Sequence, residues 1–266
     1  MALLVTERAV RDRRRGSIGW ALGIAAYVSI MTSVYPAVQD SALQRAIRNY
    51  PKELKAFFGG AASFDFSTGA GYLNVELFSL IIPALLVIVA ISYGVRALAG
   101  EQADGTLDFL LANPITRRRV VLEKVVGLWA VVVPLAAVAG AAVLAVGLFV
   151  DLGVGIDRVA IACLGATLVA VLSGTLAMLA GAATGSRAVA IGVPTAVFAA
   201  SYLIVGLAGL VSWLEPLRVA SPLYHANGTQ PLLHGLPAAN YLILLGLCGV
   251  ACCATSEVFN RRDLVR

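Results

Sequence analysis

The chain has 266 residues, of which 59% are hydrophobic and only 13% are charged, and its net charge is +5 at neutral pH. Soluble domains carry about 25% charged residues, so this composition excludes a soluble protein and predicts an all-α integral membrane protein. Residues 1–266 then form a single transmembrane domain, with no room for a second, soluble one. The basic residues cluster at the ends of apolar stretches, which favours contact with membrane lipids over binding of nucleic acid.

Six apolar stretches are long enough to cross a bilayer, which takes about 20 residues. The predicted transmembrane helices cover residues of about 18–38, 76–97, 120–149, 159–184, 188–211 and 238–257. The first follows a basic segment in the manner of a signal peptide. It is nevertheless long enough to span, and no clear cleavage site follows it, so we interpret it as a retained helix. Only three residues separate the fourth stretch from the fifth, which predicts a tight hairpin.

The arginines and lysines are distributed unequally between the two sides that these helices define. Of the 20 cations, 14 lie on the side of the N-terminus and 6 on the other, and cytoplasmic loops carry the excess of positive charge. We therefore predict a multi-pass protein of the cytoplasmic membrane with both termini in the cytoplasm. Residues 1–17 begin apolar and turn strongly basic, which fits either an elbow helix on the inner leaflet or a simple topogenic tail.

Two segments outside the predicted helices are long. Residues 39–75 form an outer loop, in which two short amphipathic pieces precede a glycine-rich part. Residues 212–237 contain four prolines and both histidines, His225 and His234. This second segment is too apolar for a free loop and too broken for a span, which predicts a re-entrant or interfacial excursion before the sixth helix. We expect its histidines to make hydrogen bonds at the membrane interface.

Residues 98–119 are the most polar interruption of the apolar sequence, and they lie between the second and third helices. A short amphipathic helix is predicted here, capped by Asp104 or Thr106. Its apolar face, at i, i+3 and i+4 spacing, consists of Leu107, Leu110 and Leu111, with Phe109 beside them. Pro114 ends this helix, and Thr116 is placed to cap the next one.

The sequence leaves two possibilities for what packs against the leucine face. The helix packs on the lipid surface or on the protein's own helix ends, or it docks in a groove of a separate soluble protein. Arg117, Arg118 and Arg119 lie in the first turn of the third helix, where the helix dipole disfavours each cation by roughly a few tenths of a kcal/mol. Inner-leaflet phosphates or an acidic partner surface would offset this unfavourable term.

The same segment resembles a known protein family. The residues that carry the resemblance are Glu101, Gly105-Thr106-Leu107, Leu110-Leu111, Pro114-Ile115-Thr116-Arg117 and Glu123-Lys124. They resemble the signature of ABC-2-type permeases, the membrane subunits of ATP-binding-cassette exporters. The layout is also similar to that family, with six helices, a basic N-terminal elbow, the polar insert and the broken excursion. The first outer loop is longer than in many members.

The resemblance implies that residues 101–112 are a coupling helix that rests on a soluble ABC ATPase subunit. It implies two such ATPases, which would hold ATP and Mg, and a second copy of the permease or a related permease. A cargo path would lie at the interface between the permeases, and no cofactor or metal is expected on this chain itself. The residues implied in coupling to the ATPase are Glu101, Asp104, Gly105, Thr106, Leu107, Phe109, Leu110, Leu111, Pro114 and Arg117.

The inner parts of the predicted helices lack ionisable side chains. No Asp, Glu, His, Lys or Arg occurs in residues 18–38, 77–95, 125–149, 159–186, 188–214 and 235–256. Proton- and ion-coupled transporters usually keep such groups within the bilayer, so this pattern indicates an external source of energy. The chain also has no GxxxxGK[ST] phosphate loop and no HExxH zinc motif. It is therefore not expected to be an enzyme by itself.

The polar side chains inside the helices are hydroxyls and phenols, and we expect them to form hydrogen bonds between helices. The alternative is that those of the first, second and fifth helices line a path for an amphipathic cargo. The candidates for such a path are Tyr27, Thr32, Ser79, Ser92, Thr195, Ser201 and Tyr202. Gly19 with Gly23, and Gly181 with Gly185, have the GxxxG spacing that permits close helix contact. The four cysteines fall in apolar stretches, which predicts packing rather than disulfides or metal binding.

We therefore interpret the chain as the permease subunit of an exporter that moves an amphipathic small molecule, a drug or antibiotic, or a lipid-like cargo. The energy would come from ATP hydrolysis by a separate subunit. Two alternatives remain open. One is a membrane scaffold or regulatory subunit that tethers a soluble partner without transport, and the other is a passive channel.

Overall fold

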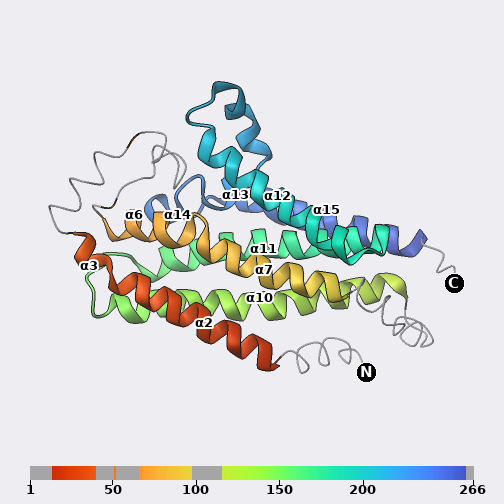
Figure 1. Ribbon diagram of the computed structural model, residues 1–266, viewed down its shortest axis with the longest axis horizontal. Helices are drawn as coiled ribbons and strands as arrows, with labels where there is room; N and C mark the ends of the chain where they lie inside the picture. The colour runs from red at the N-terminus through yellow and green to blue at the C-terminus, as the bar shows by residue number, and fades with distance from the viewer. Residues whose placement is uncertain (1–13, 40–50, 52–65, 67, 98–115, 262–266) are drawn as a thin grey trace.

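The computed structural model describes residues 14–39, 51, 66, 68–97 and 116–261, and within these ranges every regular element is a helix (Figure 1). The predicted all-helical architecture is thus confirmed. Most of the predicted elbow (1–17), the outer loop (39–75) and the coupling segment (98–119) lie outside the described residues.

Six helical segments are long and apolar enough to cross a membrane, as predicted. They are Gly16–Val38 (α2, Arg14–Ser33, with α3, Tyr35–Val38), Gly69–Val95 (α6, η1 and α7), Arg117–Gly147 (α10), Ile156–Thr184 (α11), Arg187–Leu207 (α12) and Ala238–Arg261 (α15). Most run along the long axis of the molecule, whereas α12 diverges from the bundle towards its C-terminal end (Figure 1). The start of α10 and the end of α15 lie at one end of the molecule, and α3 and α14 lie at the other.

The second span begins at Gly69 rather than at the predicted residue 76. The glycines of this region predict a loop, but here they permit close packing within a helix. The Gly69 backbone contacts the Leu152 carbonyl so closely that a Cβ would collide with it. Thr68 caps the helix, because its hydroxyl accepts a hydrogen bond from the Gly71 amide (3.1 Å). As a result, Glu76 lies inside the span.

The second span is not a uniform α-helix. Its first part, α6 (Gly69–Leu73), continues into a π-helical segment, η1 (Asn74–Phe78), and a turn at residues 79–80 precedes α7 (Ile81–Val95). Pro83 gives a physical reason for this break. Proline has no N–H to bond the Ser79 carbonyl, and its ring clashes with that carbonyl in a regular α-helix. π-helical turns are frequent at functional sites, so η1 marks a candidate position for one.

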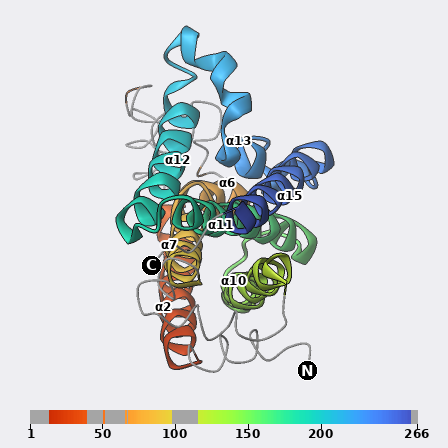
Figure 2. The same cartoon turned by 90° about the vertical axis from the view of Figure 1, so that its right-hand side faces the viewer.

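The central helix of the bundle is α11, most of which is buried. Four other spanning helices, α7, α10, α12 and α15, pack against it (Figure 2). The approach to α7 is closest at Gly94, where a Cβ would collide with the Gly174 carbonyl of α11. The first span, α2, packs along α10 and lies on the opposite side of α7 from α12 (Figure 2).

The fourth and fifth spans are joined by the tight hairpin that the sequence predicts. Gly185 ends α11 with a φ of 69°, in the left-handed region that glycine tolerates best, and its amide donates to the Gly181 carbonyl (2.8 Å). Ser186 then caps α12, because its hydroxyl accepts a hydrogen bond from the Val189 amide (3.4 Å).

Residues 212–237 fold into three short helices, η3 (Ser212–Ala220), α13 (Pro222–Asn227) and α14 (Pro231–His234), none of which is long enough to span. Buried His225 connects them to the last span. Its Nε2 lies 2.7 Å from the Val219 carbonyl oxygen, and its Nδ1 lies 3.2 Å from Asn240 Oδ1 of α15. Nδ1 of His234 lies 3.1 Å from the Thr229 carbonyl oxygen. Both histidines therefore make hydrogen bonds that hold this segment together.

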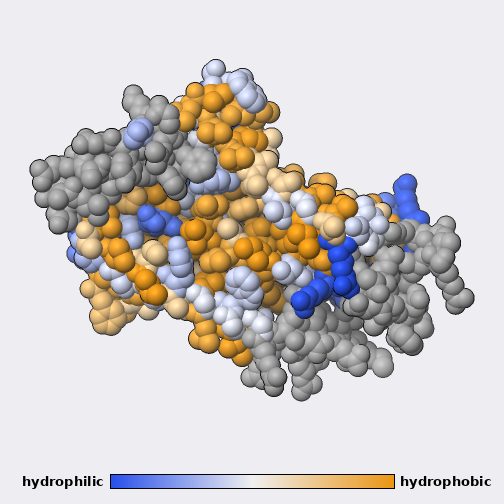
Figure 3. Space-filling view, in the orientation of Figure 1, coloured by the Kyte–Doolittle hydropathy of each residue, from blue (hydrophilic) through white to orange (hydrophobic). Residues whose placement is uncertain are grey.

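Hydrophobic residues cover much of the middle of the molecule, and strongly hydrophilic ones gather towards the end where α10 begins (Figure 3). The peripheral helices α2, α12 and α15 are the least buried of the six spans. Their outward side chains include Leu22, Ile30, Ile191, Leu242 and Val250. This distribution is typical of helices that face lipid or another membrane subunit.

Candidate functional site

Of the residues implied in coupling to an ATPase, Arg117 alone belongs to the described residues. Those outside them are Glu101, Asp104, Gly105, Thr106, Leu107, Phe109, Leu110, Leu111 and Pro114. Arg117 is the first residue of α10, immediately after the predicted coupling segment. The contacts at the start of α10 therefore show how the predicted coupling segment is connected to the helix bundle.

The first turn of α10 is bonded to the last turn of α15. Nη1 of Arg117 donates a hydrogen bond to the Phe259 carbonyl (3.1 Å), and its guanidinium carbon lies 5.8 Å from the centroid of the Phe259 ring. Nη2 of Arg118 lies 3.8 Å from Oε2 of Glu257. We call these four residues, Arg117, Arg118, Glu257 and Phe259, the α10–α15 clasp.

Arg117 contributes most to the clasp. The last carbonyls of a helix have no partner within the helix, so the Arg117 guanidinium supplies one for α15 and also stacks on the Phe259 ring. The Arg118–Glu257 pair is weak, because the two side chains are 68% and 47% exposed. Glu257 also pairs with Arg261, 2.6 Å away on its own helix.

Contacts within the chain partly compensate for the position of the three arginines at a helix N-terminus. The sequence predicts that phosphates or a partner surface must compensate for it. Within the chain, Arg117 donates a hydrogen bond to the C-terminal turn of α15, Arg118 forms an ion pair with Glu257 there, and Arg119 pairs with Glu123 one turn ahead (3.1 Å), while contact with phosphates or a partner stays a prediction. Sequence spacing gives no signal for the first two contacts, because their partners are about 140 residues away.

Thr116 occupies the N-cap position of α10, as predicted, with extended backbone angles. Its side chain makes no capping hydrogen bond. The helix start is held by its backbone instead, since the Thr116 carbonyl accepts from the Arg119 amide (2.9 Å) and the Val120 amide (3.2 Å).

Most hydroxyl candidates for a cargo path bond to their own helix. The serines and threonines that donate to the carbonyl four residues earlier are Thr32, Ser79, Thr195 and Ser201. Ser92 is exposed and makes a polar contact of its own, and Tyr202 is half-buried against the core. Since these groups are satisfied within the chain, their hydrogen bonds alone give no evidence of a cargo.

The cargo-path candidates are not gathered in one place. Tyr27 and Thr32 belong to α2, Ser79 and Ser92 to the second span, and the remaining three to α12. Because α2 and α12 lie on opposite sides of α7 (Figure 2), these residues line no single channel in one copy of the chain. A common path would require a second subunit, and the cargo-path assignment stays a prediction.

A groove of about 530 Å³ separates α2 from α7. Its lining residues are Gly16, Gly19, Trp20, Gly23, Ile24 and Tyr27 of α2, and Ile81 and Leu85 of α7. A Cβ on Gly16, Gly19 or Gly23 would meet no described atom within 4 Å. The GxxxG pair of Gly19 and Gly23 therefore leaves an open surface in the described part of the chain instead of forming a helix contact. We call this the α2–α7 groove.

Glu76 lies beside the end of the α2–α7 groove that Tyr27 forms. It belongs to η1, one turn beyond Tyr72, whose hydroxyl donates to the Met31 carbonyl of α2 (2.6 Å). Tyr27 lies one turn before Met31 on α2, which contacts η1, so Tyr27 and Glu76 belong to neighbouring turns of the two segments. Among the described residues, no cation forms an ion pair with Glu76.

The sequence predicts Glu76 as the first residue of the second span, whereas the structure places it inside the span. The helix starts at Gly69, so Glu76 lies roughly 10 Å along it. The signal that could have revealed this is Thr68, a good N-cap residue directly before the glycines. The early start of the helix was not predicted, because a glycine-rich segment is typical of a loop.

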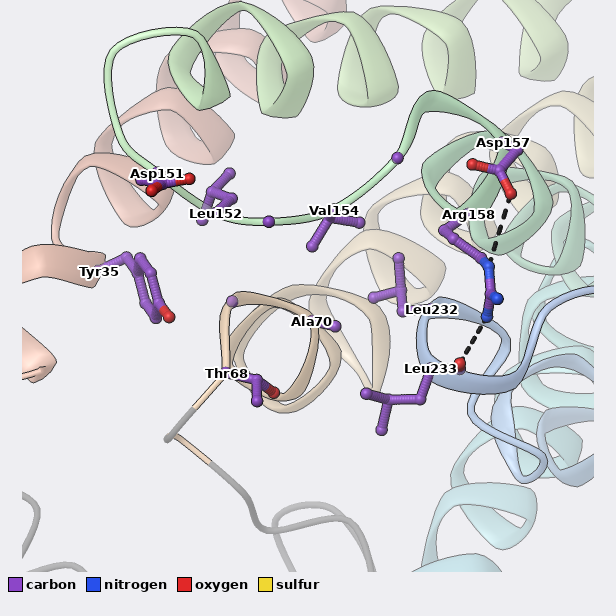
Figure 4. Close-up of a pocket in the computed structure, with 13 residues that line it drawn as sticks. Tyr35, Thr68, Ala70, Asp151, Leu152, Val154, Asp157, Arg158, Leu232 and Leu233 are labelled. Atoms are coloured by element: carbon purple, nitrogen blue, oxygen red, sulfur yellow. Dashed lines mark hydrogen bonds and ion pairs between the residues drawn. The ribbon is translucent and has the colours of Figure 1, made fainter.

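A second cavity, of about 750 Å³, lies where α6, α14 and the connection between α10 and α11 meet (Figure 4). Arg158 forms one wall. Its Nε lies 3.5 Å from Oδ2 of Asp157, and its Nη1 donates to the Leu233 carbonyl of α14. Arg158 thereby fixes the excursion to the start of α11, on the opposite end of the molecule from the clasp.

The four cysteines are free thiols, as expected. Cys163 and Cys248 are buried, and Cys248 Sγ lies 3.7 Å from the Leu168 carbonyl oxygen of α11. Within the described ranges, no group of three or more His, Cys, Asp or Glu side chains could hold a metal ion.

Six apolar helices, with α11 at the centre, define a multi-pass, all-helical membrane protein. The chain belongs to the ABC-2 family, because the family described as "ABC-2 family transporter protein" matches residues 3–264. The resemblance read from the sequence is confirmed by this match. The protein is thus a membrane component of an ABC transporter that is not itself catalytic, and its family implies association with an ABC ATPase. A comparison with curated proteins gives no match.

Proposed function

We propose that the chain is the permease subunit of an exporter that carries an amphipathic small molecule, a drug or antibiotic, or a lipid-like cargo out of the cell. Two ATPase subunits bind ATP and Mg on the cytoplasmic side, and a second permease, identical or related, completes the cargo path. Family membership and the lack of a phosphate loop in the chain support this proposal.

The α10–α15 clasp is the observation that best supports a coupling role. The family signature leads directly into Arg117 at the start of α10, and Arg117 is bonded to Phe259 at the end of α15. A displacement of the signature segment by an ATPase would therefore move α10 and α15 together. Because both helices pack against α11, the displacement would reach the centre of the bundle.

The coupling proposal is tested with the permease and its ATPase reconstituted in proteoliposomes. The double substitution Leu107→Asp with Leu110→Asp places two charges on the face expected to dock on the ATPase. We expect it to abolish nucleotide-dependent transport while membrane insertion is unchanged. The matched control is Leu217→Asp, which changes an exposed leucine of η3, in the excursion after α12, and should leave transport intact.

The same preparation separates the proposal from its rivals. A scaffold that tethers the ATPase would retain it during purification but move no cargo, and a passive channel would move solute without nucleotide. Normal transport by the doubly substituted permease would show that the Leu107 face does not dock on the ATPase.

A further inference from the structure

We propose that the α2–α7 groove and Glu76 form a binding site for a delocalised lipophilic cation, a molecule whose positive charge is spread over an apolar body. The groove measures about 530 Å³, within the range of roughly 300–1,000 Å³ that is usual for small-molecule sites. Its lining is apolar except for the polar ends of Trp20 and Tyr27. Shape and lining thus suit an apolar molecule of moderate size.

The negative charge of Glu76 at the end of the groove favours a ligand with a positive charge. Glu76 lies within a span, where a carboxylate is unfavourable unless a positive charge accompanies it. Tyr27 connects the two features, because it lines the groove and lies one turn from Met31, the residue of α2 to which Tyr72, one turn before Glu76, is hydrogen-bonded. A cation in the groove would be attracted by Glu76 and by the faces of the Trp20 and Tyr27 rings. A neutral or anionic ligand would gain neither attraction.

The direction of the groove argues against a membrane lipid as the occupant. The groove runs from Gly16, near the start of α2, to Tyr27, about 16 Å further along the helix. A phospholipid or a long-chain amine would keep its head group at the Gly16 end and leave only hydrocarbon beside Glu76. A cation whose charge is delocalised over an apolar body can bring that charge to the Tyr27 end.

A helix from a second copy of the chain is also a poor occupant. The apolar segments of the chain, residues 18–38, 77–95, 125–149, 159–186, 188–214 and 235–256, contain no Lys or Arg. Such a helix would fill the groove with hydrocarbon and bring no positive charge to Glu76. Charge complementarity therefore favours a cationic small molecule.

The test measures binding rather than transport. The full chain is placed in nanodiscs of uncharged lipid without ATPase or nucleotide, and equilibrium dialysis measures the binding of tetraphenylphosphonium. Tetraphenylborate serves as a probe of similar shape and opposite charge. We expect the phosphonium to bind saturably and the borate to bind only as it does to empty nanodiscs.

Two substitutions separate charge from shape. Glu76→Gln keeps the size of the side chain and removes the charge, so we expect the affinity for tetraphenylphosphonium to fall roughly tenfold or more. Gly23→Leu fills the groove and should also abolish binding. The matched controls are Glu215→Gln, at an exposed acid of η3, and Gly192→Leu, at a glycine of α12 whose Cβ would meet no atom within 4 Å. Neither control should alter binding.

Equal binding of the two probes, or unchanged phosphonium binding by Glu76→Gln or Gly23→Leu, would overturn the site. A Gly23→Leu variant that loses dimerisation, measured by native mass spectrometry, and keeps its affinity would identify the groove as a subunit contact instead. The statement that this cation is also a transported cargo rests on the proposed exporter function. Binding without nucleotide-driven transport would leave the site intact and refute only the statement that this cation is a cargo.

Discussion

Gly94 of α7 and Gly174 of α11 bring two helix backbones into contact at the centre of the bundle. A Cβ on Gly94 would collide with the Gly174 carbonyl, and a Cβ on Gly174 would lie 2.9 Å from the Ala90 carbonyl oxygen. Small residues permit such close approach between transmembrane helices. Since α11 is the helix against which four other spans pack, this contact determines the position of α7 relative to the rest of the protein.

The first prediction is that Gly174→Ala destabilises the protein. The added methyl group has no free space, so α7 and α11 must separate, and overpacking of this kind costs about 1–3 kcal/mol. Thermal unfolding of the purified protein in detergent should therefore occur at a lower temperature. Gly192→Ala is the control, because its Cβ would meet no atom within 4 Å. If the two variants unfold at the same temperature, the α7–α11 contact is not tight.

The second prediction concerns the α10–α15 clasp. Arg117→Ala removes the hydrogen bond to the Phe259 carbonyl and the contact with the Phe259 ring, which together contribute about 1–2 kcal/mol. We expect the number of cargo molecules moved per ATP hydrolysed to fall, because α15 no longer follows α10. ATP hydrolysis and ATPase binding should persist, because Arg117 lies beyond the leucine face.

Arg119→Ala is the matched control for this prediction. It removes an arginine from the same helical turn, but its partner, Glu123, belongs to the same helix. Transport per ATP should therefore stay at the level of the unsubstituted protein. Equal losses in the two variants would mean that the arginines act through their charge at the membrane surface and not through a bond to α15.

Sequence patterns were sufficient for the number and nature of the spans. Continuous apolar stretches identify helices in a bilayer because each backbone group must bond within its own segment. The hairpin at Gly185 and Ser186 was equally predictable, since a glycine followed by a capping serine marks the end of one helix and the start of the next.

Features that depend on contacts between distant segments could not be predicted in this way. The start of the second span at Gly69 depends on Leu152, against which that glycine packs. Arg117 contacts Phe259, and the local sequence around either residue does not predict this contact. Spacing was also misleading for the glycines, because Gly19 and Gly23 line an open groove while Gly94 and Gly174, outside any GxxxG pair, make the close contact.

The last prediction concerns the orientation of the chain in the membrane. Asp151 and Arg187 are both exposed and lie at opposite ends of α11. The excess of positive charge on the side of Arg187 places that side in the cytoplasm. In a background in which the four native cysteines are replaced by serine or alanine, a membrane-impermeant maleimide should label Asp151→Cys in intact cells. It should label Arg187→Cys only after the membrane is permeabilised.

The cysteine-free background serves as the control for labelling of other groups. The opposite pattern, with residue 187 accessible from outside, would place the start of α10 and the signature segment on the outer surface. No cytoplasmic ATPase could then reach residues 101–112, so this single result would refute the coupling proposal. It would leave the groove beside Glu76 unaffected, because binding in nanodiscs does not depend on which side of the membrane each loop occupies.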